Sequence, residues 1–267
     1  MRNIRLSASF CQQSPDFNAV TGPKAEMTGL TPGRPPGRRR LAKGETMPKG
    51  STAAPPEAPP DCPLCPRLVA FREASRQAHP EWFNGAVPSF GDASGRLVIV
   101  GLAPGLQGAN KTGRPFTGDY AGDLLYSSLA KYGFSVGEFK ARPDDGLRLK
   151  DAMITNAVRC VPPENKPTGA EILTCRQFLV SRLGQLPKMQ VVMALGRIAH
   201  DSTVRALGAK PSATVFGHAK RHELQGPRGP VVLHDSYHCS RYNTNTGRLT
   251  ERMFHDVFEG IRKDLDG

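Results

Sequence analysis

The sequence has few aromatic residues and no long hydrophobic run. Phe, Trp and Tyr make up 7% of its 267 residues, with a single tryptophan, and no apolar stretch approaches the roughly 20 residues that a membrane-spanning helix needs. Residues 1–10 are rich in Arg and Ser but lack the apolar core of a secretory signal. Membrane-spanning proteins are therefore excluded, and we expect a cytoplasmic protein.

Acidic residues are scarce relative to basic ones. The chain contains 36 Lys and Arg residues against 24 Asp and Glu residues, which gives a net charge of +12. Such an excess favours a polyanionic partner such as DNA.

The composition changes near residue 60. Residues 1–60 hold ten of the 24 prolines, only two aromatic residues and a net charge of +5, whereas residues 61–267 carry the remaining +7. A segment with so little to bury is typical of disorder. We expect a disordered basic extension over residues 1–60 and one folded, basic domain over residues 61–267.

In the second part, short apolar runs alternate with longer amphipathic stretches. This alternation predicts an α/β fold with a parallel sheet covered by helices. Strands are expected at residues 97–101, 152–157, 190–196 and 230–235, and helices at residues 66–77, 119–132, 169–185, 197–207 and 250–265.

Ligand sites of parallel sheets lie beyond the carboxyl ends of the strands. Four segments follow the predicted strands and concentrate Gly, Pro and polar residues: 101–119, 155–160, 196–197 and 234–243. These segments are expected to meet and form the functional site.

Four of the six cysteines suggest a metal site. Cys62 and Cys65 form a C-x2-C pair, and Cys160 and Cys175 lie further along the chain. In a chain without an extracellular signal, this spacing favours metal ligation over disulfides, and both zinc and a 4Fe-4S cluster accept four cysteines. The single short pair favours the cluster, although two unrelated pairs of buried cysteines would give the same spacing.

The motif Gly101-Leu-Ala-Pro-Gly-Leu-Gln-Gly108 is followed by the Gly-rich segment 110–122. It matches neither a dinucleotide-binding fingerprint nor a P-loop, so a nucleotide cofactor is not expected. Together with Thr155-Asn156, the four cysteines and His238-Cys-Ser240, it closely resembles the family 5 uracil-DNA glycosylases. The resemblance covers roughly residues 60–263.

The resemblance implies a three-layer α/β/α sandwich around a four-stranded parallel sheet and a 4Fe-4S cluster on Cys62, Cys65, Cys160 and Cys175. It also implies an enzyme that excises uracil, and other deaminated bases such as hypoxanthine, from DNA in base excision repair. We expect a monomer, associated with the nucleoid if the protein is bacterial. Family 4 enzymes are similar but carry Glu where this chain has Leu102. There are two alternatives. One is a family 4-type glycosylase that excises uracil only, and the other is a non-catalytic DNA-binding module that is stabilised by zinc or an iron-sulfur cluster.

Three side chains are candidates for catalysis within this resemblance. Asn156 offers the acceptor and donors that match the uracil edge. His238 would donate a hydrogen bond to the departing base, and Asp119 would orient the attacking water. Without the resemblance, His238 reads as a surface residue, Asn156 as a turn residue and Asp119 as a helix cap. No lysine stands out as a Schiff-base nucleophile, so we expect a monofunctional enzyme that leaves an abasic site.

The remaining candidates bind the base or the DNA. Phe116 would stack on the flipped base, or else belong to the core, and the Gly101, Ala103 and Gly105 backbone would line the base and water site. Cys239 stands where the family has Pro, which frees a backbone torsion and is expected to loosen the loop. The wedge and minor-groove segment, otherwise an ordinary polar loop, would consist of Ser240, Arg241, Tyr242 and Asn243, with Ser240 on a phosphate.

Overall fold

Four parallel strands form the centre of the main sheet in the computed structural model, which describes residues 55–267. They are β2 (Leu97–Gly101), β5 (Ala152–Asn156), β6 (Val191–Leu195) and β8 (Gly229–Ser236). Every residue of β2, β5 and β6 is buried, as expected for strands covered on both faces. The four strands predicted from the sequence are confirmed to within a residue or two at each end.

Two antiparallel edge strands extend this sheet to six strands, in the order β1-β5-β2-β6-β8-β7. The four parallel strands are those expected, and the sheet has two antiparallel strands more than predicted. β1 (Phe90–Gly91) has only two residues. β7 (Arg221–Gly226) alternates exposed and half-buried residues, so it shows no apolar run that could have revealed it. A separate two-stranded sheet joins β3 (Ser135–Val136) and β4 (Arg148–Leu149).

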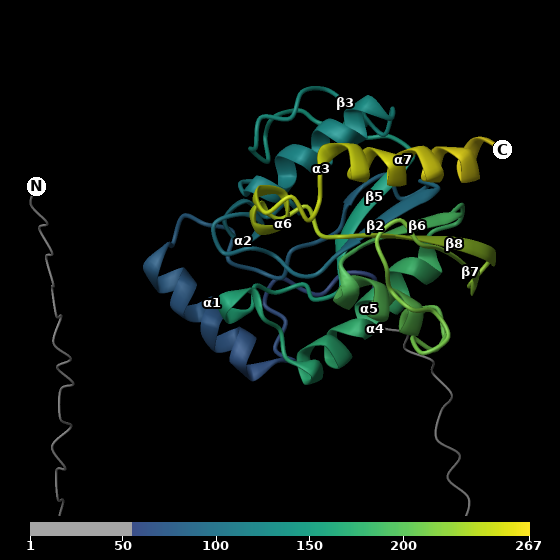
Figure 1. Cartoon of the computed structure of the whole chain (residues 1–267). Coiled ribbons are helices and arrows are strands. Elements are labelled where there is room, and N and C mark those ends of the chain that lie inside the picture. Colours follow the sequence, from purple (N-terminus) through teal and green to yellow (C-terminus); the bar gives the residue numbers. More distant parts are fainter. Residues whose placement is uncertain (1–54) are drawn as a thin grey trace, which may run out of the picture. The chain divides into compact units, whose positions relative to one another are not determined.

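Helices cover both faces of the sheet (Figure 1). On one face, α3 (Tyr120–Lys131) and α7 (Glu251–Asp266) pack on side chains such as Ile99 and Met193. On the other face, α4 (Gly169–Gln185) and α5 (Arg197–Ala206) pack on Val98 and Val192. The expected α/β/α sandwich is confirmed. The remaining helices are α1 (Pro66–Ala78), α2 (Ala109–Thr112), the 3-10 turn η1 (Pro163–Asn165) and α6 (Arg241–Asn245).

Local signals explain where the long helices begin. The Thr168 side chain accepts from the Glu171 N–H, and the Glu171 carboxylate accepts from the Thr168 N–H, which forms a capping box at the start of α4. Thr250 caps α7 in the same way, through the Met253 N–H. None of the helices among the described residues is long and apolar enough to cross a membrane.

The predicted disordered extension lies outside the described residues as far as residue 54. Its last residues are described, and they pack onto the fold: Ala58 is buried, and the Pro60 carbonyl accepts from the Ala86 N–H. Glu57 accepts hydrogen bonds from Arg159 and Arg182. The buried Arg159 guanidinium is thus paired with the Glu57 carboxylate. The fold therefore extends to the N-terminal side of residue 60.

Candidate active site

The loops that follow the parallel strands enclose a pocket of about 950 Å³. The pocket lies beyond the carboxyl ends of β2, β5 and β8, where the topology places it. The structure brings together the sequence-predicted residues Ala103, Gly105, Phe116, Asp119, Asn156, His238, Ser240 and Arg241 in its lining.

Asn156 and Phe116 both lie against Gly101. Gly101 and Asn156 are register partners in neighbouring strands. A Cβ atom on residue 101 would collide with Asn156 Oδ1 and lie 2.7 Å from Phe116 Cζ. Glycine is therefore needed here for close approach, and Gly101 forms the floor beneath the two side chains. Asn156 is 2% exposed, and its Oδ1 has no hydrogen-bond partner among the described residues.

Replacing Gly101 with alanine is expected to lower the free energy of unfolding by about 1–3 kcal/mol, because the added methyl group overpacks a buried site. Chemical denaturation measures this effect. Gly184→Ala is the matched control, because a Cβ at residue 184 of α4 meets nothing within 4 Å. If the two variants are equally stable, the packing described around Gly101 is wrong.

Phe116 and His238 stack on each other at the pocket wall, with ring centroids 5.8 Å apart and an interplanar angle of 27°. Phe116 is 7% exposed and belongs to the core packed under α3, and it also lines the pocket. Its φ of 52° is in the left-handed region, which a non-glycine residue adopts only when its surroundings impose it. The surroundings of Phe116 therefore fix its backbone, and its ring packs between His238 and Gly101.

His238 is electrically neutral at neutral pH, because burial lowers its pKa to about 4. A neutral imidazole donates one N–H hydrogen bond and carries no charge. The backbone of His238 is held by Asn243, whose Nδ2 donates to the His238 carbonyl at 2.8 Å.

Asp119 occupies the position before the first residue of α3, but its side chain makes no capping hydrogen bond. The carboxylate instead faces the glycine-rich loop, where a Cβ atom on Gly105 would lie 3.1 Å from Oδ2 and one on Gly108 would collide with it. Its Oδ1 is buried and has no hydrogen-bond partner among the described residues. Burial raises the pKa of the Asp119 carboxyl above its usual value.

The predicted wedge segment is helical rather than a loop. The Ser240 side chain accepts from the Asn243 N–H and caps α6. Ser240 and Arg241 line the pocket, and the Arg241 guanidinium lies 5.2 Å from the centre of the Tyr120 ring. Tyr242 is 70% exposed beside the pocket, whereas the Asn243 side chain is engaged with the backbone of His238.

Cys239 joins the His238 segment to the first turn of α3. It is fully buried, and its Sγ donates to the Ala121 carbonyl at 3.3 Å. Burial raises the pKa of this thiol to about 12, so it remains protonated. A proline at this position could not make this hydrogen bond, because its side chain has no donor. The hydrogen bond of Cys239 therefore compensates for the backbone freedom that comes with the absence of proline.

A buried ion pair that the sequence did not suggest holds the loop of Phe116. The Arg114 guanidinium donates two hydrogen bonds of 2.7 Å to Asp145, and its Nε donates to Thr117 Oγ1 at 2.8 Å. These contacts hold the pKa of Asp145 well below its usual value.

The sequence analysis also missed Asn165, which lines the pocket and has a φ of 56°. The only feature of the sequence that could have indicated this residue is its position after a predicted strand.

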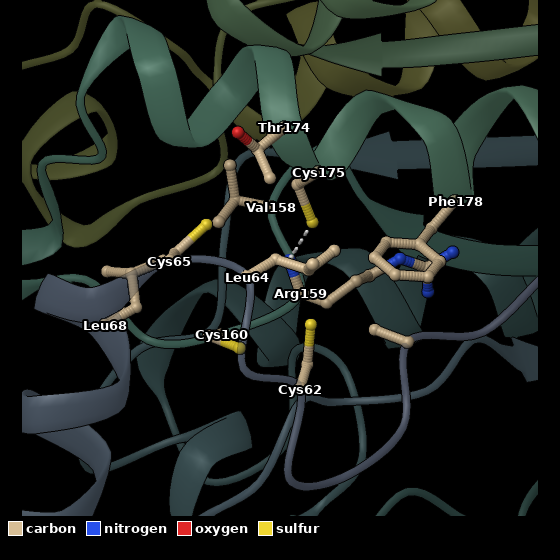
Figure 2. A pocket seen from close by; sticks show the side chains of 11 residues that line it. Cys62, Leu64, Cys65, Leu68, Val158, Arg159, Cys160, Thr174, Cys175 and Phe178 are labelled. Atoms are coloured by element: carbon tan, nitrogen blue, oxygen red, sulfur yellow. Dashed lines mark hydrogen bonds between the residues drawn. The ribbon is translucent and has the colours of Figure 1, made fainter. Parts of the chain in front are cut away.

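The four predicted cysteines lie around a second, smaller pocket (Figure 2). Cys62 and Cys65 precede α1, Cys160 follows β5 and Cys175 lies in α4, and all four are free thiols. Leu64, Leu68 and Phe178 complete an apolar wall. The Arg159 N–H points at Cys175 Sγ at 3.3 Å, and Arg72 Nη1 lies 3.9 Å from Cys160 Sγ.

Comparison with known proteins identifies relatives of the chain. The family model of the uracil DNA glycosylase superfamily matches residues 88–262. The type-5 uracil-DNA glycosylase of Thermus thermophilus is 46% identical over 202 residues, which cover 73% of this chain and 90% of that protein. The type-5 enzymes of Mycobacterium bovis and Pyrobaculum aerophilum are 40% and 36% identical, over 76% of this chain and 77% and 89% of those proteins.

Proposed function

Because the chain belongs to the uracil DNA glycosylase superfamily, and within it to the type-5 uracil-DNA glycosylases, we propose that it excises uracil from DNA in base excision repair. The observation that carries this proposal is the pair of unpartnered oxygen atoms, Asn156 Oδ1 and Asp119 Oδ1, in one pocket of the described residues. Of the nine buried side-chain atoms without a partner among the described residues, these two belong to residues that line this pocket, where a ligand can complete their hydrogen bonding.

The pocket accepts a base that has left the duplex. Flipping a nucleotide costs a few kcal/mol, least at a mismatch such as U:G. The ring of Phe116, which lines the pocket, offers the base a stacking surface. Asn156 Oδ1 accepts from the imide N–H of uracil, which supplies the missing partner of this oxygen.

His238 stabilises the departing base. Cleavage of the N-glycosidic bond leaves negative charge on a base oxygen, and one well-placed donor to such an oxygen contributes about 3 kcal/mol. His238 is neutral, so it donates an N–H to this oxygen without transferring a full positive charge. Asn243 and the stacked Phe116 ring fix its orientation.

Asp119 orients the water that attacks the sugar. Its carboxylate lies beside Gly105 and Gly108 of the glycine-rich loop. Because these two residues have no side chains, they leave space beside the carboxylate. In its ionised form, the carboxylate holds the water and accepts its proton. No lysine lines the pocket among the described residues, which supports a monofunctional enzyme that leaves an abasic site.

Arg241 and Tyr242 contact the DNA beside the flipped nucleotide. Arg241 lies over the Tyr120 ring at the pocket rim, and Tyr242 projects from α6 into solvent. Ser240 holds a phosphate at the pocket edge. The pocket volume also accommodates deaminated purines, so we include hypoxanthine among the substrates.

The four cysteines hold a 4Fe-4S cluster in this proposal. A zinc ion with Zn–S bonds of 2.3 Å would bring the sulfur atoms to about 3.8 Å from one another. No three cysteine sulfur atoms of the described residues lie within 4.8 Å of one another, which supports a group larger than a single ion. A bound cluster with its four thiolates would carry negative charge beside the buried Arg72, whose Nη1 lies 3.9 Å from Cys160 Sγ, and the Arg159 backbone N–H would donate to the Cys175 ligand. The cluster supplies a structural link between α1, β5 and α4.

Cleavage of a labelled duplex with one U:G pair tests the activity. The full-length, iron-loaded protein is incubated with the duplex, and alkali then breaks the strand at any abasic site. We expect strand breakage that requires alkali and is absent from the matched C:G duplex. A second duplex carries hypoxanthine. Intact strands in both cases, from folded protein that still binds DNA, would replace the enzyme proposal with a DNA-binding module.

A further inference from the structure

Three potential metal ligands converge far from the cysteines in sequence and outside the pocket lining. They are His200 on α5, His222 on β7 and Asp235 on β8; β7 and β8 are paired strands at one edge of the sheet, and α5 packs on a face of the same sheet. One ligand atom from each side chain lies within 4.8 Å of the other two, and no other described group of His, Cys, Asp and Glu residues meets this condition. His200 Nδ1 is 2.7 Å from Asp235 Oδ1, and His222 Nε2 is 3.1 Å from Asp235 Oδ2.

The hydrogen bonds of His200 require either a second proton or a metal ion at Nδ1. His200 Nε2 is 2.6 Å from the Thr214 carbonyl oxygen, which only accepts, so Nε2 carries a proton. In a neutral imidazole, Nδ1 then has a lone pair, and a lone pair 2.7 Å from a carboxylate oxygen is repulsive. Either a second proton or a metal ion must therefore lie between Nδ1 and Asp235.

The surroundings match those of a built metal site. His200 and Asp235 are fully buried, and the His222 side chain is 14% exposed, which gives access from one side. The Thr214 carbonyl holds the ring of His200, and the Gly217 N–H donates to Asp235 Oδ2 at 3.2 Å. Outer contacts of this kind orient the ligands of metal sites. Among the described residues, no Lys or Arg side chain forms an ion pair with Asp235.

We propose that His200 Nδ1, His222 Nε2 and Asp235 bind a zinc ion. Bonds of 2.0–2.1 Å in a tetrahedral site separate the ligand atoms by about 3.3 Å, so the measured 2.7 and 3.1 Å require only a small expansion. Two imidazoles and one carboxylate select zinc over magnesium or calcium, which prefer oxygen ligands. A water molecule entering on the side of His222 completes the coordination. The ion would join α5, β7 and β8 three residues before His238.

Zinc binding by the iron-loaded, full-length protein tests this proposal. The protein is dialysed against zinc sulfate and then freed of excess zinc, and zinc and iron are measured in the same sample by mass spectrometry. We expect one zinc ion per chain with no loss of iron, and X-ray absorption at the zinc edge should show nitrogen and oxygen ligands. In His222→Gln, zinc affinity should fall at least about tenfold.

The glutamine variant retains an amide N–H that can still donate to Asp235, which limits disturbance of the fold. His79→Gln is the matched control, because His79 stacks on Trp82 and has no neighbouring ligands. Zinc should raise the melting temperature of the wild-type and His79→Gln proteins and leave that of His222→Gln unchanged. Sulfur ligands at the zinc edge, release of iron or absence of zinc from the wild-type protein would each overturn the proposal, without bearing on uracil excision.

Discussion

Replacing Asp119 with asparagine is expected to lower the turnover number for uracil excision by about 100-fold or more, because a positioned general base contributes at least that factor. The same change should leave the free energy of unfolding unchanged or raise it. Burial raises the pKa of Asp119, which means that the folded state disfavours the ionised carboxylate. At neutral pH the charge is therefore a cost to the fold, and asparagine removes it. Single-turnover kinetics and thermal unfolding measure the two effects.

The wild-type enzyme should also lose activity at acidic pH, because protonation inactivates Asp119. This loss should begin above pH 3.8, the usual pKa of an Asp carboxyl, because the pKa of Asp119 is raised. The residual activity of Asp119→Asn should not show this loss at acidic pH. Asp123→Asn is the matched control, since Asp123 lies in the first turn of α3 and also lines the pocket. Equal losses in the two variants, or a loss of DNA binding as large as that of turnover, would contradict the role assigned to Asp119.

Replacing Cys175 with serine is expected to give a colourless protein with a loss of stability of more than about 4 kcal/mol, the size associated with loss of a metal group. Cys175 is buried in α4 and accepts from the Arg159 backbone N–H, and loss of the cluster would leave the buried Arg72 guanidinium beside Cys160 without the negative charge of the cluster. Iron content, the visible spectrum and the soluble fraction measure this effect.

Cys239→Ser is the control for the cysteine prediction, because Cys239 is also buried but contacts the Ala121 carbonyl in α3, away from the other four described cysteines. This variant should keep its colour and its iron. A brown, stable Cys175→Ser protein would remove Cys175 from the cluster ligands, and a colourless Cys239→Ser protein would show that colour reports general misfolding.

The parallel strands and long helices could be predicted because their patterns are local. An apolar run such as residues 97–101 gives a buried strand, and Thr168 with Glu171 marks the start of α4. The candidate site followed from topology, since residues at the ends of parallel strands must meet. The role of Asn243 did not follow, because its side chain binds the backbone of His238. The sequence also left open whether Asp119 caps α3, because its position before the helix gives no information about where its carboxylate points.

Contacts between residues distant in sequence were beyond prediction. The Arg114–Asp145 pair that holds the loop of Phe116 has no local pattern, since either residue alone reads as a solvated surface charge. The edge strand β7 is similarly hidden, because its side chains are only half buried and its pairing is with β8 alone. In both cases the structure of one segment is decided by a partner that the sequence does not identify.

The ion pair of Glu57 sets a limit for shortening the chain. Arg159 is 1% exposed and donates to Glu57 at 2.9 Å, and the Pro56 carbonyl accepts from the same guanidinium. Removing one partner of a buried pair typically costs about 3–5 kcal/mol. A truncated protein that starts at residue 61, where the composition changes, would leave this buried guanidinium without its carboxylate partner. Expression of a minimal catalytic fragment should therefore begin at or before Pro55.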